Sequence, residues 1–279
     1  MPEGDTIYRA AVAMHRALAG RVVTRFESVY PAVMRIAVDR PIVGRTIESV
    51  SARGKHLLIA FSGDLILRTH MRMSGSWHLY GAGARWQRPA RDMRVLVATC
   101  EVEAVGFNVP VAELLTARDL SRHAQLSALG PDLLDPAFDA AEAARRIRAR
   151  GREPVGDVLL NQRVLAGIGN VFKSEILFLG GIEPFTPVAA LSDPDIERLV
   201  AIAREQLAAN VLTRSQSLNP SIGRRTTRSL DPNIKFWVYG RGGERCRRCG
   251  SLIEARKSGL DARLTYWCPR CQPARPAAA

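Results

Sequence analysis

The sequence lacks any apolar run close to the roughly 18 residues that a membrane-spanning helix needs, so we expect no membrane partner. It also lacks a charged-then-apolar leader ahead of its first helical pattern, which predicts a cytoplasmic location. Aromatic residues make up only 6% of the 279 residues, but hydrophobic residues make up 47%. That is enough apolar material for two domains with their own cores.

Acidic residues are scarce relative to basic ones. The chain has 40 Lys and Arg against 27 Asp and Glu, a net charge of +13. From Arg214 to the end there are 14 basic and 4 acidic residues, so this last quarter carries +10 of the excess. Arg outnumbers Lys there, which suits bidentate contacts to phosphates. The charge pattern predicts a polyanionic partner, with a basic tail that serves only solubility as the alternative.

Cysteine is also rare, and four of the five cysteines form two Cys-x-x-Cys pairs: Cys246, Cys249, Cys268 and Cys271. Two such pairs separated by eighteen residues bring four thiolates around one structural Zn²⁺ with no open coordination position. Disulfides are the alternative, but they are unusual in intracellular proteins. The fifth, Cys100, stands alone in a predicted strand and is expected to be buried.

Between the cysteine pairs, residues 251–255 and 264–267 are predicted to form the two strands of a hairpin. We expect its loop to project three basic side chains toward a partner: Arg256, Lys257 and Arg263. A basic hairpin braced by a metal suits nucleic acid. Taken alone, it would equally suit an RNA-binding zinc ribbon.

The chain begins Met1-Pro2-Glu3, and a small second residue allows Met1 to be removed. Pro2 would then carry a secondary amine, and α-amino groups titrate near ~7.7–8, against ~10.4 for a lysine. Such an amine can attack an aldehyde-level carbon and form an iminium ion, while the Glu3 carboxylate moves protons. A helix predicted over residues 6–19 would lower the amine pKa further through its positive end. The alternative is an ordinary processed terminus.

Residues 22–107 contain short Val-, Ile- and Leu-rich segments with no helical pattern between them, which predicts an antiparallel sandwich of two sheets. The expected strands are 22–28, 46–53, 56–61, 65–70, 76–80, 94–98 and 102–107. Helical periodicity then appears at 139–150, 155–160, 171–179 and 193–212. Residues 213–233 are polar and aperiodic, which indicates a linker. We therefore expect an α+β multidomain chain divided into residues 2–125, 126–233 and 234–272.

The segment Gly167-Ile168-Gly169-Asn170 lies at the start of one predicted helix. Glycines allow close backbone approach, and free N–H groups at a helix start attract phosphate. Gly169 and Asn170 are therefore candidate DNA-binding residues, with an ordinary tight turn as the alternative.

Four separated motifs together resemble the formamidopyrimidine-DNA glycosylase / endonuclease VIII family over nearly the full length. The motifs are Pro2-Glu3-Gly4, Arg53-Gly54-Lys55-His56, Leu165-Ala166-Gly167-Ile168-Gly169-Asn170, and Trp237-Val238-Tyr239-Gly240-Arg241 followed by the cysteines. The resemblance implies an N-terminal helix with a β-sandwich, a helix-two-turn-helix domain and a C-terminal zinc finger. It also implies a monomer that repairs damaged double-stranded DNA, located in the cytoplasm at the nucleoid.

The resemblance further implies site residues for a base-excision glycosylase and lyase. Pro2 would attack the sugar, Glu3 would shuttle protons, and Lys55 would assist elimination and contact phosphate. Asn170 would bind phosphate, and Arg263 would support δ-elimination. The alternative for Lys55 is a solvated turn lysine. These roles suit a flipped-out base at an exposed sugar carbon.

Two departures favour the endonuclease VIII branch, and with it oxidised pyrimidines. Residues 104–110 lack the Arg-Phe pair of the formamidopyrimidine branch, and the start reads Pro2-Glu3-Gly4-Asp5. We expect Arg72 or Met73 to enter the base stack instead. The alternative for Met73 is a place in the core. A non-catalytic DNA-damage binder of the same fold is the alternative function.

The basic C-terminal quarter predicts steep salt dependence of duplex DNA binding, because each neutralised phosphate contributes about −0.9 to the slope of log K against log salt. Binding isotherms between 50 and 200 mM salt measure this slope. A flat slope would contradict the assignment of the basic region to DNA.

Overall fold

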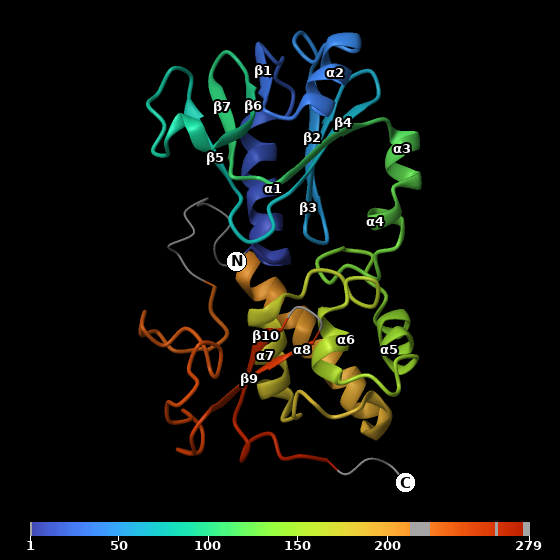
Figure 1. Cartoon of the computed structure of the whole chain (residues 1–279), viewed down its shortest axis with the longest axis vertical. Coiled ribbons are helices and arrows are strands. Elements are labelled where there is room, and N and C mark those ends of the chain that lie inside the picture. Colours follow the sequence, from blue (N-terminus) through green and yellow to red (C-terminus); the bar gives the residue numbers. More distant parts are fainter. Residues whose placement is uncertain (1, 213–223, 260–261, 276–279) are drawn as a thin grey trace. The chain divides into compact units, whose positions relative to one another are not determined.

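A computed structural model describes residues 2–212, 224–259 and 262–275 (Figure 1). The described residues form two compact units, which divide between Ala128 and Leu129. The first unit contains the β-rich half, and the second contains the helical half together with the cysteine-rich segment. The division into residues 2–125, 126–233 and 234–272 stays a prediction. Among the described residues, no helix is long and apolar enough to cross a membrane.

The first unit is the expected antiparallel sandwich with an N-terminal helix, α1 (Gly4–Leu18). One sheet has the order β1-β6-β7-β5, formed by Arg25–Ser28, Met93–Ala98, Val102–Phe107 and Ser76–Gly81. The other has the order β2-β3-β4-β8, formed by Ile47–Arg53, His56–Phe61, Leu65–His70 and Val111–Leu115. The prediction of two sheets is confirmed.

Alternation along the strands and the helical period of α1 build one core. Leu65 and Leu67 of β4 are at most 1% exposed and share a cluster with Ile7 and Met14 of α1. Neighbouring side chains in a strand point to opposite faces, so the residues between them lie on the outer face of the sheet. Near one end of β4, that outer face carries the polar residues Arg68 and His70.

Several features of the first unit differ from expectation. The helix α2 (Pro31–Asp39) and the strand β8 were not predicted; α2 begins with proline at its first turn and buries only Val33. Two short helices, α3 (Ala117–Arg122) and α4 (Ala124–Ser127), end the unit. The expectation that Cys100 is buried in a strand is wrong, because Cys100 is exposed in the turn between β6 and β7.

The second unit contains the helices α5 (Ala140–Arg148), α6 (Val155–Leu160), α7 (Asn170–Gly180) and α8 (Asp193–Leu212). These helices match the predicted ones within a few residues. Gly181 ends α7 in the left-handed conformation, with φ 67°. The predicted linker lies partly outside the described residues; its described part, 224–233, contains no helix or strand.

The cysteine-rich segment forms a hairpin of β9 (Glu254–Ser258) and β10 (Arg263–Trp267). The first strand was predicted at 251–255 and lies about three residues later. Residues 251–253 instead follow the first cysteine turn, where the N–H of Cys246 donates to the carbonyl of Ser251 at 2.7 Å. Arg256 and Lys257 therefore lie in β9 rather than in the hairpin loop.

Leu67→Ala should destabilise the first unit by about 2–5 kcal/mol, because it leaves a cavity in a fully buried position. The matched control is Ile66→Ala on the same strand, whose half-buried side chain faces the other way and should cost less. Denaturant unfolding of both variants measures the difference. Equal losses would contradict the assignment of the core face.

Candidate active site and zinc centre

Pro2 and Glu3 stand at the start of α1. The carbonyl of Glu3 accepts hydrogen bonds from the N–H groups of Thr6 and Ile7 at 3.0 and 3.1 Å, so the helix begins directly after it. Glu3 is wholly buried and Pro2 is half-buried. A free amine on Pro2 would lie at the positive end of α1, which favours its neutral, nucleophilic form.

Lys55 lies in the two-residue turn that joins β2 to β3, where Arg53 pairs with His56 across the hairpin. Gly54 takes the first turn position with φ 57° and is buried. A left-handed residue at this position is the reason for glycine in the motif. Lys55 is half-buried. It directly precedes His56, whose side chain lies on the outer face of the sheet.

Residues 71–75 form the tight turn between β4 and β5. Gly75 donates its N–H to the carbonyl of Met71 at 2.9 Å, and a Cβ on Gly75 would lie 2.6 Å from that oxygen. Met71 is 2% exposed, whereas Met73 is 68% exposed. The alternative that Met73 belongs to the core is therefore wrong. Arg72 is also exposed and has φ 45°, an uncommon backbone conformation for a side chain of this size.

Two histidines beside this turn escaped the sequence analysis. His56 and His70 pair across β3 and β4, and their ring centroids are 4.8 Å apart. Burial, together with the charge of Arg68, lowers the pKa of His56 to about 2 and that of His70 to about 4. His70 Nδ1 accepts the backbone N–H of Arg72 at 3.1 Å. Aligning the predicted strands 56–61 and 65–70 outward from the turn at residues 62–64, where Phe61 pairs with Leu65, would have shown that these histidines are neighbours.

In the second unit, Gly169 precedes α7 and Asn170 opens it. The Asn170 side chain is 7% exposed, and its Nδ2 donates to the carbonyl of Leu264 on β10 at 2.8 Å. Its Oδ1 is buried and has no hydrogen-bond partner in the described part of the chain. The turn ahead of it is held by Gln162, whose side chain bonds the backbone of Gly167 and Ile168. Asn170 therefore faces the finger hairpin.

Arg263 is the first residue of β10 and pairs with Ser258. It directly precedes Leu264, the residue whose carbonyl binds Asn170. The predicted phosphate-contacting residues Asn170 and Arg263 thus lie on adjoining elements of one unit. Arg256, which was expected in the loop, instead places its guanidinium 3.6 Å from the ring centre of Phe185.

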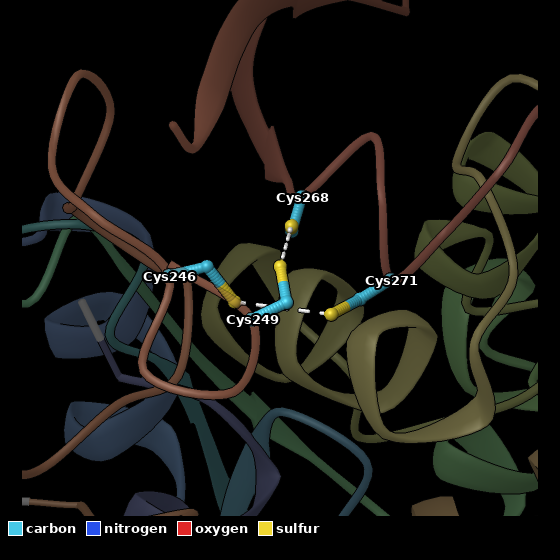
Figure 2. A group of neighbouring side chains, drawn as sticks. All are labelled: Cys246, Cys249, Cys268 and Cys271. Atoms are coloured by element: carbon cyan, nitrogen blue, oxygen red, sulfur yellow. Dashed lines mark hydrogen bonds between the residues drawn. The ribbon is translucent and has the colours of Figure 1, made fainter. Parts of the chain in front are cut away.

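The four cysteines meet at one point (Figure 2). Their sulfur atoms all lie within 4.8 Å of one another; Cys246 and Cys271 are 3.9 Å apart, and Cys249 and Cys268 are 3.5 Å apart. Zinc–thiolate bonds of about 2.3 Å in a tetrahedron require sulfur separations of about 3.8 Å. Donors also point at the sulfurs: the Arg248 N–H approaches Cys246 Sγ at 3.4 Å.

Hydrogen bonds from Ser251 lower the pKa of Cys249 to about 6, while burial raises the pKa of Cys268. The donor set is complete with four thiolates, so a bound zinc has no position for substrate. These residues fit one structural Zn²⁺, as predicted.

The base of the finger is tied to α7 by Glu175, which is wholly buried. Its carboxylate accepts the backbone N–H groups of Trp237, Val238 and Tyr239 at 2.8, 2.9 and 2.8 Å. Burial raises the pKa of Glu175, and these hydrogen bonds oppose that rise. The segment that leads into the first cysteine pair is thereby held from the same helix that carries Asn170.

Three family models match successive parts of the chain. They are the formamidopyrimidine-DNA glycosylase N-terminal domain over residues 1–109, the H2TH domain of the same enzyme over 129–220, and a zinc finger found in FPG and IleRS over 243–274. A relative named probable endonuclease 8 2, from Streptomyces coelicolor, is 41% identical over 98% of this chain and 94% of its own.

A second relative, the DNA-(apurinic or apyrimidinic site) lyase Nei2 of Mycolicibacterium smegmatis, is 38% identical over 98% of this chain and 100% of its own. Solved structures of Lactococcus lactis Fpg share the fold. Its complex with abasic-site DNA has a TM-score of 0.81 at 23% identity, covering 98% of this chain and 100% of that one. Its complex with DNA containing an oxidised pyrimidine has a TM-score of 0.82 at 24% identity, with the same coverage. On these matches, the chain belongs to the formamidopyrimidine-DNA glycosylase / endonuclease VIII family of DNA glycosylases and AP lyases.

Proposed function

We propose that this protein excises oxidised pyrimidines from double-stranded DNA and then cleaves the abasic strand by β- and δ-elimination. The observation that carries the proposal is Pro2, which is half-buried at the positive end of α1 with the buried Glu3 beside it. A neutral secondary amine in this position can form a covalent iminium with a sugar carbon. The relatives named endonuclease 8 and AP lyase support the same chemistry.

In the proposed reaction the damaged nucleotide is first flipped out of the duplex. The Pro2 nitrogen attacks C1′, the base leaves, and proton transfer through Glu3 to the ring oxygen opens the sugar to an iminium. The iminium withdraws electrons, so a 2′ proton is lost and the 3′ phosphate departs. A second elimination then releases the 5′ phosphate, and hydrolysis of the iminium frees Pro2.

We assign supporting roles to residues of both units. Lys55, fixed in a two-residue turn, would contact phosphate and assist elimination. Arg263 would support δ-elimination and Asn170 would contact phosphate, as in the motifs that they resemble. One N–H of the Asn170 Nδ2 already donates to the Leu264 carbonyl, and Oδ1 cannot donate to a phosphate, so the amide must turn or use its remaining N–H to reach one.

We infer the lesion class from the side chains that are available to fill the space that the flipped-out nucleotide leaves in the base stack. Phe107 and Val109 are wholly buried, so the segment corresponding to the Arg-Phe pair offers neither of these side chains to the base stack. Met73 is 68% exposed on a tight turn, next to the exposed Arg72. We therefore propose that these two residues insert into the base stack. We also propose that the substrate is an oxidised pyrimidine. We further propose that the protein acts as a monomer, in the cytoplasm at the nucleoid.

Borohydride should trap a covalent complex with a duplex containing an abasic site, because reduction makes the Pro2 iminium permanent. Pro2→Gly should reduce trapping strongly, and acylation of the terminus should abolish it. Glu3→Gln should impair excision of an oxidised pyrimidine more than cleavage of a preformed abasic site, since the latter needs no base to leave. Gel analysis of the trapped product measures all of these.

The control for terminal processing is mass spectrometry of the same preparation. If correctly processed protein binds the duplex but forms no trapped complex, the alternative function of a non-catalytic damage binder holds. Full activity with Met1 retained would rule out Pro2 as the nucleophile.

Cys268→Ser should remove zinc and abolish duplex binding, because the finger hairpin loses a wholly buried ligand. The first unit should keep its fold. Cys100→Ser is the matched control: it makes the same replacement at an exposed cysteine and should bind zinc and DNA normally. Zinc content and binding isotherms measure the outcome, and normal binding by zinc-free Cys268→Ser would contradict the structural role.

A further inference from the structure

A polar network lies on the outer face of the β2-β3-β4-β8 sheet, behind the Lys55 turn. Arg68 of β4 points to this face, opposite to the core residue Leu67, yet it is only 1% exposed. Gln125 of α4 contacts the guanidinium, and His123 lies just before α4. A buried guanidinium is costly unless its hydrogen bonds are satisfied, so its partners are informative.

Arg68 contacts three elements at once. Its NH1 donates to Glu113 of β8 at 2.5 Å, and its NH2 donates to Gln125 of α4 at 2.6 Å. The same NH2 lies 3.0 Å from Nδ1 of His56 on β3. Glu113 is held in turn by Nε2 of His123 at 3.1 Å. Arg68 therefore connects β3 to β8 and to the last helix of the first unit.

The contact with His56 matters because His56 directly follows Lys55. A guanidinium only donates, so Nδ1 of His56 must accept, and the neutral ring then carries its proton on Nε2. The ring is fixed between Arg68 and the edge contact with His70. His56 is also the residue that closes the Gly54–Lys55 turn by pairing with Arg53. Fixing this ring therefore fixes the base of the Lys55 turn.

We propose that Arg68 is a positioning residue for Lys55, acting through His56 from the outer face of the sheet. This inference rests on the proposed role of Lys55 in elimination. In the proposed reaction, Arg68 does not touch the reacting atoms. Its removal should therefore slow the chemical step while leaving duplex binding nearly unchanged, because small displacements of a catalytic group reduce rates strongly.

The network also holds both histidines neutral. The charged and titratable groups facing His56 and His70 are Arg68, His123, Arg53, Lys55 and Arg72, and Glu113 bonds Arg68 and His123. Burial is the largest cause of the low pKa of both rings, and the charge of Arg68 adds to it. Without that charge, both pKa values should rise, so protonation would begin at a higher pH. Protonated His70 could not accept the Arg72 N–H, which would loosen the Met73 turn.

Arg68→Met tests the inference, since methionine fills a similar volume without charge. We expect single-turnover cleavage of an abasic-site duplex to slow at least ~10-fold, with duplex Kd within about twofold of the wild type. NMR titration should show higher pKa values for His56 and His70. The cleavage rate of the variant should fall on acidification from pH 7 to 5 more than that of the wild type. Arg21→Met is the matched control, because it breaks an ion pair of half-buried Arg21 with exposed Glu101 in the same unit.

A second pair of variants decides the matter if Arg68→Met does not fold. His56→Asn retains an acceptor near the position of Nδ1 and should keep most of the rate, whereas His56→Leu should lose it. Wild-type rates in folded Arg68→Met, or equal rates in the two His56 variants, would overturn the inference. If the wild-type protein traps no abasic DNA, the proposed function itself fails. In that case the NMR titration alone tests whether Arg68 acts on His56. An unchanged His56 pKa in Arg68→Met would show that it does not.

Discussion

The burial of one face of α1 in the β-sandwich is the constraint on which the proposed role of Pro2 depends. Ile7, Met14 and Leu18 are at most 1% exposed, so the helix cannot shift along its axis without opening the core. Chain ends usually fray. Here the first turn begins at Gly4, and Glu3 is already wholly buried. Pro2 therefore has a defined location only because the helix behind it belongs to the core.

In the second unit, α7 holds the hairpin of the zinc finger in place, as α1 holds Pro2 in the first unit. Its residues are buried on all sides, including two of opposite charge, Lys173 and Glu175. Lys173 Nζ donates to the Thr265 hydroxyl on β10 at 2.6 Å, while Glu175 accepts three consecutive backbone N–H groups ahead of the first cysteine pair. Asn170 adds a bond to Leu264. The hairpin register is thus held by α7 as well as by the four cysteines, and each buried charge has a partner.

Much of this arrangement could be predicted from local patterns. The helices α6 and α8 matched expectation, because periodicity and N-terminal residues are local signals. The cysteine spacing alone specified a closed metal site. Expectation failed where tertiary contacts decide: Cys100 lies in an exposed turn, and the first hairpin strand begins at Glu254 because the preceding residues close the cysteine turn. An isolated strand pattern carries no information on such turns.

By itself, the sequence indicated the chemistry that we propose: an imino terminus on Pro2 once Met1 is removed, a carboxylate beside it, a lysine in a glycine turn and a four-thiolate centre. Covalent structure and short spacing are enough for these, because each depends on residues within a few positions. Only the tertiary structure decided that Met73 is exposed and Met71 buried, and that His56 and His70 are neighbours. It also brought Arg68 into contact with Glu113 and Gln125, which are 45 and 57 positions away in sequence. Sheet pairing and burial set those contacts, and neither is a local property of the chain.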